Sequence, residues 1–370
     1  MSYLLNILFL LFTFQVSAVD YDNFPPLGAD PSEGLLLIDD LDEKELIEPR
    51  SDLDKALELQ SSVKSQGQRG TCSIFSAVAL IESKLINEGL FFSEDIDLSE
   101  EWVQYIAMKG RESDGYWSFR SWNNISKHGV PLESEWPYDP RDWTKLTDNE
   151  LVQHRCANSG VENKTSCLLG HRNEMLVDAP FEYLIDENNS LFDPEFLRIK
   201  TEAQEFKDSF ISDLFDATVS WSSAYSVYSI SEVRENLRNG EMMTLSVPFF
   251  YGAWNHGQAT KLNIGVNEES WKKGLVGYPE KGSVDHHVSR QKENRAGHSI
   301  LIVGYDDDIE IVTKQKMTDG TIKEFKYKGA YIFKNSWGTA SFGSESNVLP
   351  GYGIITKKYA HEYGRFYQLK

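Results

Sequence analysis

Three cysteines in the 370-residue chain could act as nucleophiles or form disulfides, and one of them stands apart. Cys156 and Cys167 lie close together in a polar stretch, which makes them natural disulfide partners in an oxidising compartment. Cys72 is left unpaired. Because a lone cysteine is most often a small buried hydrophobe, a catalytic role for Cys72 depends on its neighbours.

The segment before Cys72 has features that activate a thiol. The sequence QGQRGT takes the chain through a glycine-bearing turn into a helix that is predicted to begin at Cys72. The unpaired N–H groups and the dipole of a first helical turn favour negative charge, so they lower the pKa of a thiol placed there. The backbone N–H of Cys72 and the side-chain amide of Gln66 could bind the oxyanion that forms when the thiol attacks an amide.

A thiol nucleophile needs a base and a group that orients the base. His298 stands directly before an apolar run, SILIV, that is predicted to be a buried strand. Asn335 follows another predicted strand, and the nearby Trp337 could cover a bond between His298 and Asn335. The pattern therefore predicts a triad of Cys72, His298 and Asn335.

Three segments resemble those of papain-like cysteine peptidases, in the order that this family has. QGQRGTCSIFS resembles the nucleophile segment, GHSILIVGYD the histidine segment and FKNSWG the asparagine segment. Weaker matches, LSEEWVQY, SDGYWSF and EWPYD, fall between them. Arg69 stands three positions before the nucleophile, where eukaryotic members usually have a cysteine. In this respect the chain is similar to bacterial members, which often lack that disulfide.

The resemblance implies a cysteine peptidase that works through a thioester acyl-enzyme. It implies an α+β, two-lobed papain-like fold, with a helical N-terminal lobe, a β-rich C-terminal lobe and the active cleft between them. Asp114 and Gly115 would offer backbone groups to the substrate, and Trp337 would also line the substrate site. The implied partner is a peptide or protein substrate, with no cofactor and no metal.

Two further departures from the family concern the substrate side. Ser73 stands where the family usually has a tryptophan. The second tryptophan-glycine pair expected after Trp337 is replaced by a longer stretch that reaches Gly351. These changes put the substrate-side geometry in question and leave the triad intact.

The order of the predicted elements is helices first and strands second, which favours the α+β class. Predicted helices begin at Cys72 and near Ser99, which is a suitable N-cap. Predicted strands include residues 299–303 and a hairpin that turns at Asp319-Gly320.

Three regions are predicted along the chain: a signal peptide at 1–18, an acidic arm at 19–60, and a peptidase domain at 61–370 with an insertion at about 140–230. The first apolar run is too short to span a bilayer, so a cleaved signal is preferred over an uncleaved anchor. The stretch between the nucleophile and the histidine exceeds the roughly 130 to 150 positions usual for this class. We expect part of the insertion to restrict access to Cys72; decoration on the back of the helical lobe is the alternative.

The formal net charge of -20 argues against a broad basic surface for nucleic acid or anionic lipid. Once the signal peptide is removed, no membrane attachment is expected, and the protein would be secreted or periplasmic. The sequence predicts no particular oligomeric state.

Two other histidine sites have a less specific pattern. The His286-His287 pair could suggest metal binding, but no further ligand follows at a defined spacing, so a solvated loop is the preferred interpretation. His256, beside Trp254, could line the cleft; a surface loop is again preferred.

Two other functions fit the same motifs. A catalytically inactive relative could bind peptides or a protein partner in the cleft, although all four catalytic positions are intact. A thiol transferase or amidase could use the same acyl chemistry on a non-peptide amide.

We predict that Cys156 and Cys167 are bonded in protein exported through an oxidising compartment. The loop they close is short, so the bond should add about 2 to 3 kcal/mol of stability on the chain-entropy model. A non-reducing peptide map measures the pairing, and two free thiols in that map would refute it.

Overall fold

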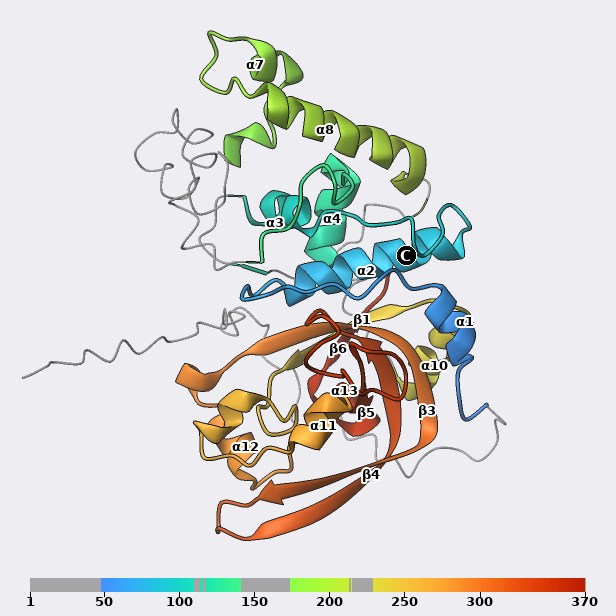
Figure 1. The fold of residues 1–370 in the computed structure, drawn as a ribbon, viewed down its shortest axis with the longest axis vertical. Helices are drawn as coiled ribbons and strands as arrows, with labels where there is room; N and C mark the ends of the chain where they lie inside the picture. The colour runs from blue at the N-terminus through green and yellow to red at the C-terminus, as the bar shows by residue number, and fades with distance from the viewer. Residues whose placement is uncertain are drawn as a thin grey trace, which may run out of the picture.

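The α+β, two-lobed architecture is present in the computed structural model (Figure 1). Helices dominate the first half of the described chain, and the main sheet follows in the second half, as the sequence predicts. Helix α2 (Cys72–Asn87) lies between the sheet and two other helices, α3 (Glu100–Met108) and α4 (Ser118–His128). The structure describes residues 48–109, 114–115, 118–140, 174–212, 214 and 229–369.

Helix α2 is the centre of the helical lobe. Its apolar residues at helical spacing are completely buried; they are Ile74, Val78, Ile81 and Leu85. The predicted start of this helix at the nucleophile is confirmed, and its apolar face is the reason that the chain is helical here.

Two further helices pack on α2, namely α3 (Glu100–Met108) and α4 (Ser118–His128). The predicted N-cap of α3 is confirmed, because the Ser99 hydroxyl accepts a hydrogen bond from the backbone N–H of Trp102 at 3.1 Å.

The described part of the predicted insertion adds a second helical layer. Figure 1 shows α7 and α8 on the side of α3 and α4 that faces away from the sheet. The elements of this layer are η4 (Glu174–Leu176), α7 (Phe181–Ile185), α8 (Pro194–Phe206) and a π-helical turn, η5 (Lys207–Ile211).

Aromatic packing attaches this layer to the helical lobe. Phe196 of α8 stacks on Trp102 with 5.6 Å between ring centroids, and it meets Tyr105 edge-on at 5.8 Å. Residues 174–212 therefore follow the alternative of a decoration on the back of the helical lobe, and the expected restriction of access to Cys72 does not hold for them. The rest of the insertion lies outside the described residues.

One six-stranded sheet forms the β lobe, with the order β2-β5-β4-β3-β1-β6. Paired neighbours are antiparallel except β2 and β5, which are parallel. The strands are β1 (Met243–Pro248), β2 (Leu275–Val276), β3 (Gly297–Lys316), β4 (Ile322–Lys334), β5 (Tyr352–Thr356) and β6 (Arg365–Tyr367). The short helices around them are α10 (Ile230–Arg238), η6 (Gly257–Thr260), α11 (Glu268–Lys272), α12 (Val284–Val288), η7 (Lys292–Asn294) and α13 (Lys357–Tyr363).

The long hairpin of β3 and β4 positions two of the predicted site residues. The hairpin turns at Gly320, whose φ of +85° suits a glycine. His298 is the second residue of β3 and pairs with Val247 of β1. Asn335 directly follows Lys334, the last residue of β4. Two adjacent strands therefore hold the predicted base and its orienting residue at the same end of the sheet.

The end of the predicted acidic arm packs on the β lobe. Residues 48–60 include α1 (Leu53–Glu58), which contacts β3, and the backbone N–H of Ser51 donates to Tyr305 O at 3.0 Å. The remainder of the arm and the predicted signal peptide lie outside the described residues. Within the described ranges, no helix has the length and apolar character needed to cross a bilayer.

Gly129 lies at a close contact between α8 and the helical lobe, so a substitution there measures how tightly α8 packs. Its φ is +75°, and a Cβ added there would lie 1.9 Å from Ala203 O in α8. We predict that Gly129→Ala lowers the free energy of unfolding by about 3 kcal/mol or more, because backbone strain and a main-chain clash both contribute.

Gly89→Ala is the matched control for this substitution. Gly89 has a φ of +70° and no atom within 4 Å of the added Cβ, so only strain of about 1 to 2 kcal/mol is expected. Urea unfolding of both variants measures the difference. Equal losses would mean that α8 does not pack against this turn.

Candidate active site

Cys72 is the first residue of α2 and is 7% exposed. The N-cap, Thr71, makes no capping bond with its side chain, and its hydroxyl instead pairs with the Tyr138 hydroxyl at 2.6 Å. The backbone N–H groups of Ser299 in β3, Ser73 and Cys72 itself face the sulfur and lower the pKa of the thiol. The thiol therefore lies where the helical lobe meets the first residues of β3.

The side-chain amide of Asn335 fixes which nitrogen of His298 carries the proton. Asn335 Oδ1 accepts a hydrogen bond from the backbone N–H of Ser336 at 2.9 Å, and a backbone N–H can only donate. This bond determines which end of the amide faces the imidazole, and Oδ1 lies 2.8 Å from His298 Nε2. Nε2 must therefore be protonated, which leaves Nδ1 as the basic nitrogen of the neutral ring.

An aromatic wall encloses His298. Trp337 stacks on the imidazole with ring centroids 4.4 Å apart, and Trp254 meets it edge-on at 5.1 Å. Trp337 in turn stacks on Trp271 of α11 at 5.5 Å. The second tryptophan that the family usually has after Trp337 is absent from this sequence. The ring that stacks on Trp337 here is Trp271, from a distant segment of the chain. Together these rings cover the His298–Asn335 bond.

His256 belongs to the same wall. Its ring is half-buried and lies 5.5 Å from Trp271 and 6.2 Å from Trp337. His256 lies in the loop before η6, as the preferred interpretation has it, but its ring packs on the wall and is not fully exposed. Burial lowers the pKa of His256, and the proximity of His256 contributes to lowering the pKa of His298.

Gln66 is held at both ends of its amide. Its Oε1 accepts a hydrogen bond from Ser336 Oγ at 2.7 Å, and its Nε2 donates to Arg69 O at 2.6 Å. An amide nitrogen has two N–H groups, so a second one remains for an oxyanion. Because Ser336 also fixes Asn335, one serine anchors both the oxyanion candidate and the orienting residue.

Asp114 and Gly115 lie against the nucleophile turn. Gly115 has a φ of +76°, and a Cβ there would lie 2.3 Å from Gly70 O, so a larger residue does not fit. The Gly115 N–H already donates to Gln104 Oε1 at 3.1 Å. We therefore expect a substrate to reach the carbonyl of Gly115 rather than its N–H. The contact itself stays a prediction.

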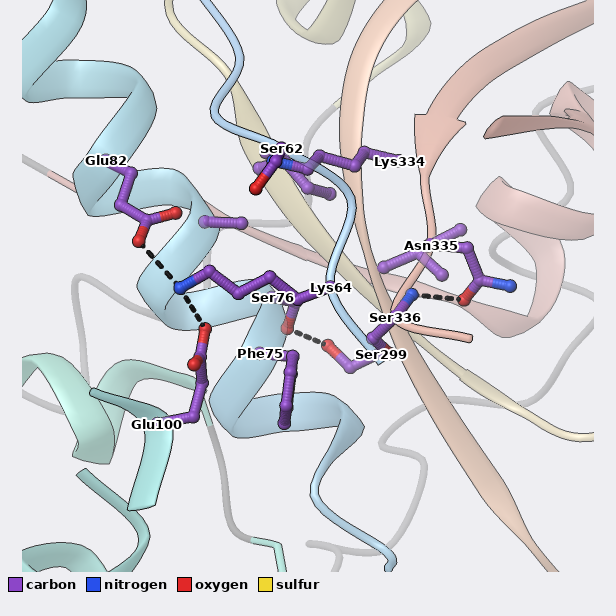
Figure 2. Close-up of a pocket in the computed structure, with 13 residues that line it drawn as sticks. Ser62, Lys64, Phe75, Ser76, Glu82, Glu100, Ser299, Lys334, Asn335 and Ser336 are labelled. Carbon is purple, nitrogen blue, oxygen red and sulfur yellow. Dashed lines mark hydrogen bonds and ion pairs between the residues drawn. The ribbon is translucent and has the colours of Figure 1, made fainter. Parts of the chain in front are cut away.

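Serine hydroxyls join the two lobes next to Cys72. Ser299 Oγ of β3 lies 2.8 Å from Ser76 Oγ of α2 and 3.5 Å from Ser118 Oγ of α4 (Figure 2 shows the first pair). Ser246 Oγ of β1 donates to the same oxygen at 3.3 Å. This cluster holds Ser299 of β3 in place, and the backbone N–H of the same residue lowers the pKa of the Cys72 thiol.

A small cavity lies beside the serine cluster (Figure 2). Its volume is about 20 Å³, which is enough for one water molecule. Ser76, Ser299 and Asn335 are among its lining residues, whereas Cys72 and His298 are not. The cavity therefore lies between the two lobes, away from Cys72 and His298.

Lysines compensate buried carboxylates at the same interface. Lys64 Nζ lies 2.9 Å from Glu82 Oε1 and 2.8 Å from Glu100 Oε1 (Figure 2). Burial raises the pKa of Glu100 to about 8, against the opposing effect of Lys64. Lys334, directly before Asn335, donates to Ser61 O at 2.7 Å, and burial lowers the pKa of Lys334 to about 8. This network ties the end of β4 to the segment that leads into the nucleophile turn.

Burial opposes charge on both the thiol and the imidazole. It raises the pKa of Cys72 to about 11, although the N–H groups that face the sulfur act in the opposite direction. It also lowers the pKa of His298 to about 4, against the bond to Asn335. Each group alone is therefore neutral near pH 7. A proton transfer from sulfur to Nδ1 creates both charges together, and their attraction offsets part of the cost of burial.

The remaining predicted sites are less informative. Cys156 and Cys167 lie outside the described residues, and Cys72 is a free, buried cysteine. The His286-His287 pair lies in α12 and not in a loop, with His286 stacked on Phe250 at 5.9 Å. Over the described ranges, no three or more His, Cys, Asp or Glu side chains are grouped so that they could hold a metal ion.

Three residues that build the site were not predicted from sequence: Ser299, Ser336 and Trp271. Ser299 and Ser336 adjoin predicted residues, so their position along the chain was a usable signal. Trp271 had no local signal, because its partners come from distant segments of the chain.

Comparison with known proteins shows which family part of the chain resembles. The family model described as "Papain family cysteine protease" matches residues 49–188. Over this stretch the chain is similar to papain-family cysteine proteases. Cysteine proteinase 1 of Entamoeba histolytica is 34% identical to the chain over 88 residues, which are 23% of the chain and 28% of that relative. The match thus spans little more than a quarter of the relative's length.

Two solved protease structures also align with the chain. Xylellain, a cysteine protease from Xylella fastidiosa, is 16% identical with a TM-score of 0.49, over 88% of this chain and 86% of its own. The bromelain protease from Ananas comosus in complex with the E64 inhibitor is 18% identical with a TM-score of 0.41, over 87% of this chain and 98% of its own.

We predict that His298 stays neutral between about pH 5 and 8 in the Cys72→Ala variant. No thiolate is present there to favour the imidazolium, and burial lowers the pKa of His298 to about 4. Nitrogen-15 NMR of the ring should show the Nε2–H tautomer throughout, with the signals assigned by a Cys72→Ala/His298→Gln variant. A titration near the ordinary value of about 6.5 would contradict the enclosed position of the ring.

Proposed function

We propose that the chain is a cysteine peptidase that hydrolyses peptide bonds. The observation that carries this proposal is the fixed tautomer of His298, which leaves its Nδ1 basic. The next residue, Ser299, has a backbone N–H that lowers the pKa of the Cys72 thiol. The proposed roles are nucleophile for Cys72, base for His298, orienting residue for Asn335 and oxyanion donor for Gln66.

The proposed chemistry has two stages. The sulfur of Cys72 gives its proton to His298 Nδ1 and attacks the carbonyl carbon of the scissile peptide. The backbone N–H of Cys72 and the Gln66 amide bind the oxyanion. The C–N bond then breaks, the amine leaves with the proton from His298, and a thioester remains. Water, deprotonated by His298, hydrolyses the thioester to release the acid and restore the thiol.

The burial of the site favours peptide segments over folded surfaces. Cys72, His298 and Asn335 are 7%, 4% and 4% exposed, so a scissile bond must reach them in an extended segment. The Trp337 ring would line one side of the approach to His298. The expected secreted or periplasmic location is part of this proposal and rests on the apolar first residues of the sequence.

No observation favours an inactive peptide-binding protein. Loss of activity in such a relative would require a missing catalytic or oxyanion group, and the sequence keeps the residue type that each proposed role needs at Cys72, His298, Asn335 and Gln66. The non-peptide amidase uses the same steps, so it differs only in the substrate that the cleft accepts.

We predict that Cys72→Ala abolishes peptide hydrolysis without unfolding the protein. In the parent, an epoxide or iodoacetamide probe should label Cys72 at pH 5 to 6 far faster than a free thiol, because the pair with His298 supplies thiolate there. His298→Ala should remove this reactivity at low pH. Fluorogenic peptide cleavage and mass spectrometry of the labelled residue measure these effects.

Gln66→Ala separates binding of the oxyanion from reactivity of the thiol. It should lower kcat by about 100-fold, while the alkylation rate of Cys72 changes by less than about threefold, since alkylation forms no oxyanion. Cleavage that survives in Cys72→Ala would rule out the mechanism. Labelled but inactive parent protein would support the peptide-binding alternative.

A further inference from the structure

Arg69 is a buried cation at the centre of the nucleophile turn. Its side chain is 3% exposed, and it forms ion pairs with Glu101 of α3 at 2.5 Å and with Asp114 at 2.9 Å. The Asp114 pair is bidentate, because Nε also donates to the second carboxylate oxygen at 3.2 Å. Nη1 donates in addition to Asp139 O at 3.1 Å. One side chain therefore joins the turn to three other segments.

On one side, Arg69 is linked through hydrogen bonds to Gly115, which is expected to bind the substrate backbone. Asp114 Oδ1 accepts from Gln104 Nε2 at 3.1 Å, and Gln104 Oε1 accepts from the Gly115 N–H at 3.1 Å. Gly115 lies directly against the Gly70 carbonyl. The position of Gly115 relative to the turn therefore depends on the Arg69–Asp114 pair.

On the other side, Arg69 is bonded to the proposed oxyanion residue. The Arg69 carbonyl accepts from Gln66 Nε2 at 2.6 Å, which sets the direction of the amide. The backbone N–H of Arg69 also donates to Gln66 O at 3.2 Å. A shift of Arg69 would therefore move the donor that faces the oxyanion.

We propose that Arg69 is a positioning residue that fixes Gln66 and Gly115 relative to one another, and so aligns the oxyanion donor with the bound substrate backbone. This inference rests on the proposed peptidase function. A planar guanidinium suits this task because it binds two carboxylates in a defined geometry, which the single ammonium of a lysine does not. The position is one where the family often has a cysteine, so here an ion-pair cluster makes the connection.

The test uses Arg69→Lys and a triple variant that carries none of the three charges, Arg69→Met/Glu101→Gln/Asp114→Asn. Arg69→Met alone would leave two buried carboxylates without a cation and could unfold the protein. Both chosen variants avoid this, since one retains the charge and the other removes all three charges together. Arg198→Met is the control, because Arg198 pairs with Glu135 on the outside of the helical lobe, and its side chain is 51% exposed.

Rates are normalised to the number of sites labelled by an epoxide probe, so a loss of folded protein does not count as a loss of activity. Arg69→Lys and the triple variant should each lower kcat by about tenfold, with Cys72 alkylation changed by less than about threefold. Arg198→Met should match the parent. An unchanged kcat per labelled site in both Arg69 variants would overturn the proposal.

A double-mutant cycle separates positioning from a merely structural role. If Arg69 acts through Gln66, then Arg69→Lys should cost less than about threefold in the Gln66→Ala background. A full tenfold loss in that background would overturn the proposal. Failure of the peptidase function itself would look different, because the parent would then show no hydrolysis that depends on Cys72.

Discussion

Contact between the first turn of α2 and the start of β3 is the constraint on which the site depends. The nucleophile belongs to one lobe and the base to the other, so their distance is only as well defined as this interface. The interface accordingly uses directional bonds, such as Ser76 to Ser299 at 2.8 Å and Lys64 to Glu82 at 2.9 Å. Apolar packing alone would allow the lobes to slide, whereas hydrogen bonds fix their register.

Burial has two opposing effects in this site. It raises the pKa of the Cys72 thiol and lowers that of His298, so neither ion is favoured alone. The same low dielectric strengthens the attraction between thiolate and imidazolium and the bonds to an oxyanion. The aromatic wall over His298 therefore makes catalysis depend on the pair as a unit.

Local patterns in the sequence were sufficient for the elements that present the predicted triad. The apolar spacing after Cys72 predicted α2, and Ser99 predicted the start of α3. What the sequence could not supply was pairing between distant segments. Trp271 reaches Trp337 from another part of the chain, and His256 faces the wall and not a free surface. Arg69 was visible only as a departure from a family pattern, because its value depends on Glu101 and Asp114 folding around it.

The way the insertion is attached explains how a long addition is compatible with a narrow site. Residues 138–140, where the insertion begins, bind the nucleophile turn directly, since Pro140 O accepts from the Gln68 N–H at 3.0 Å. The later helices then pack on the opposite face of that lobe through Phe196 and Trp102. Loop length costs little free energy once both ends are anchored. Insertions between these two anchors can therefore vary widely, provided that the contact at Pro140 keeps the turn in place.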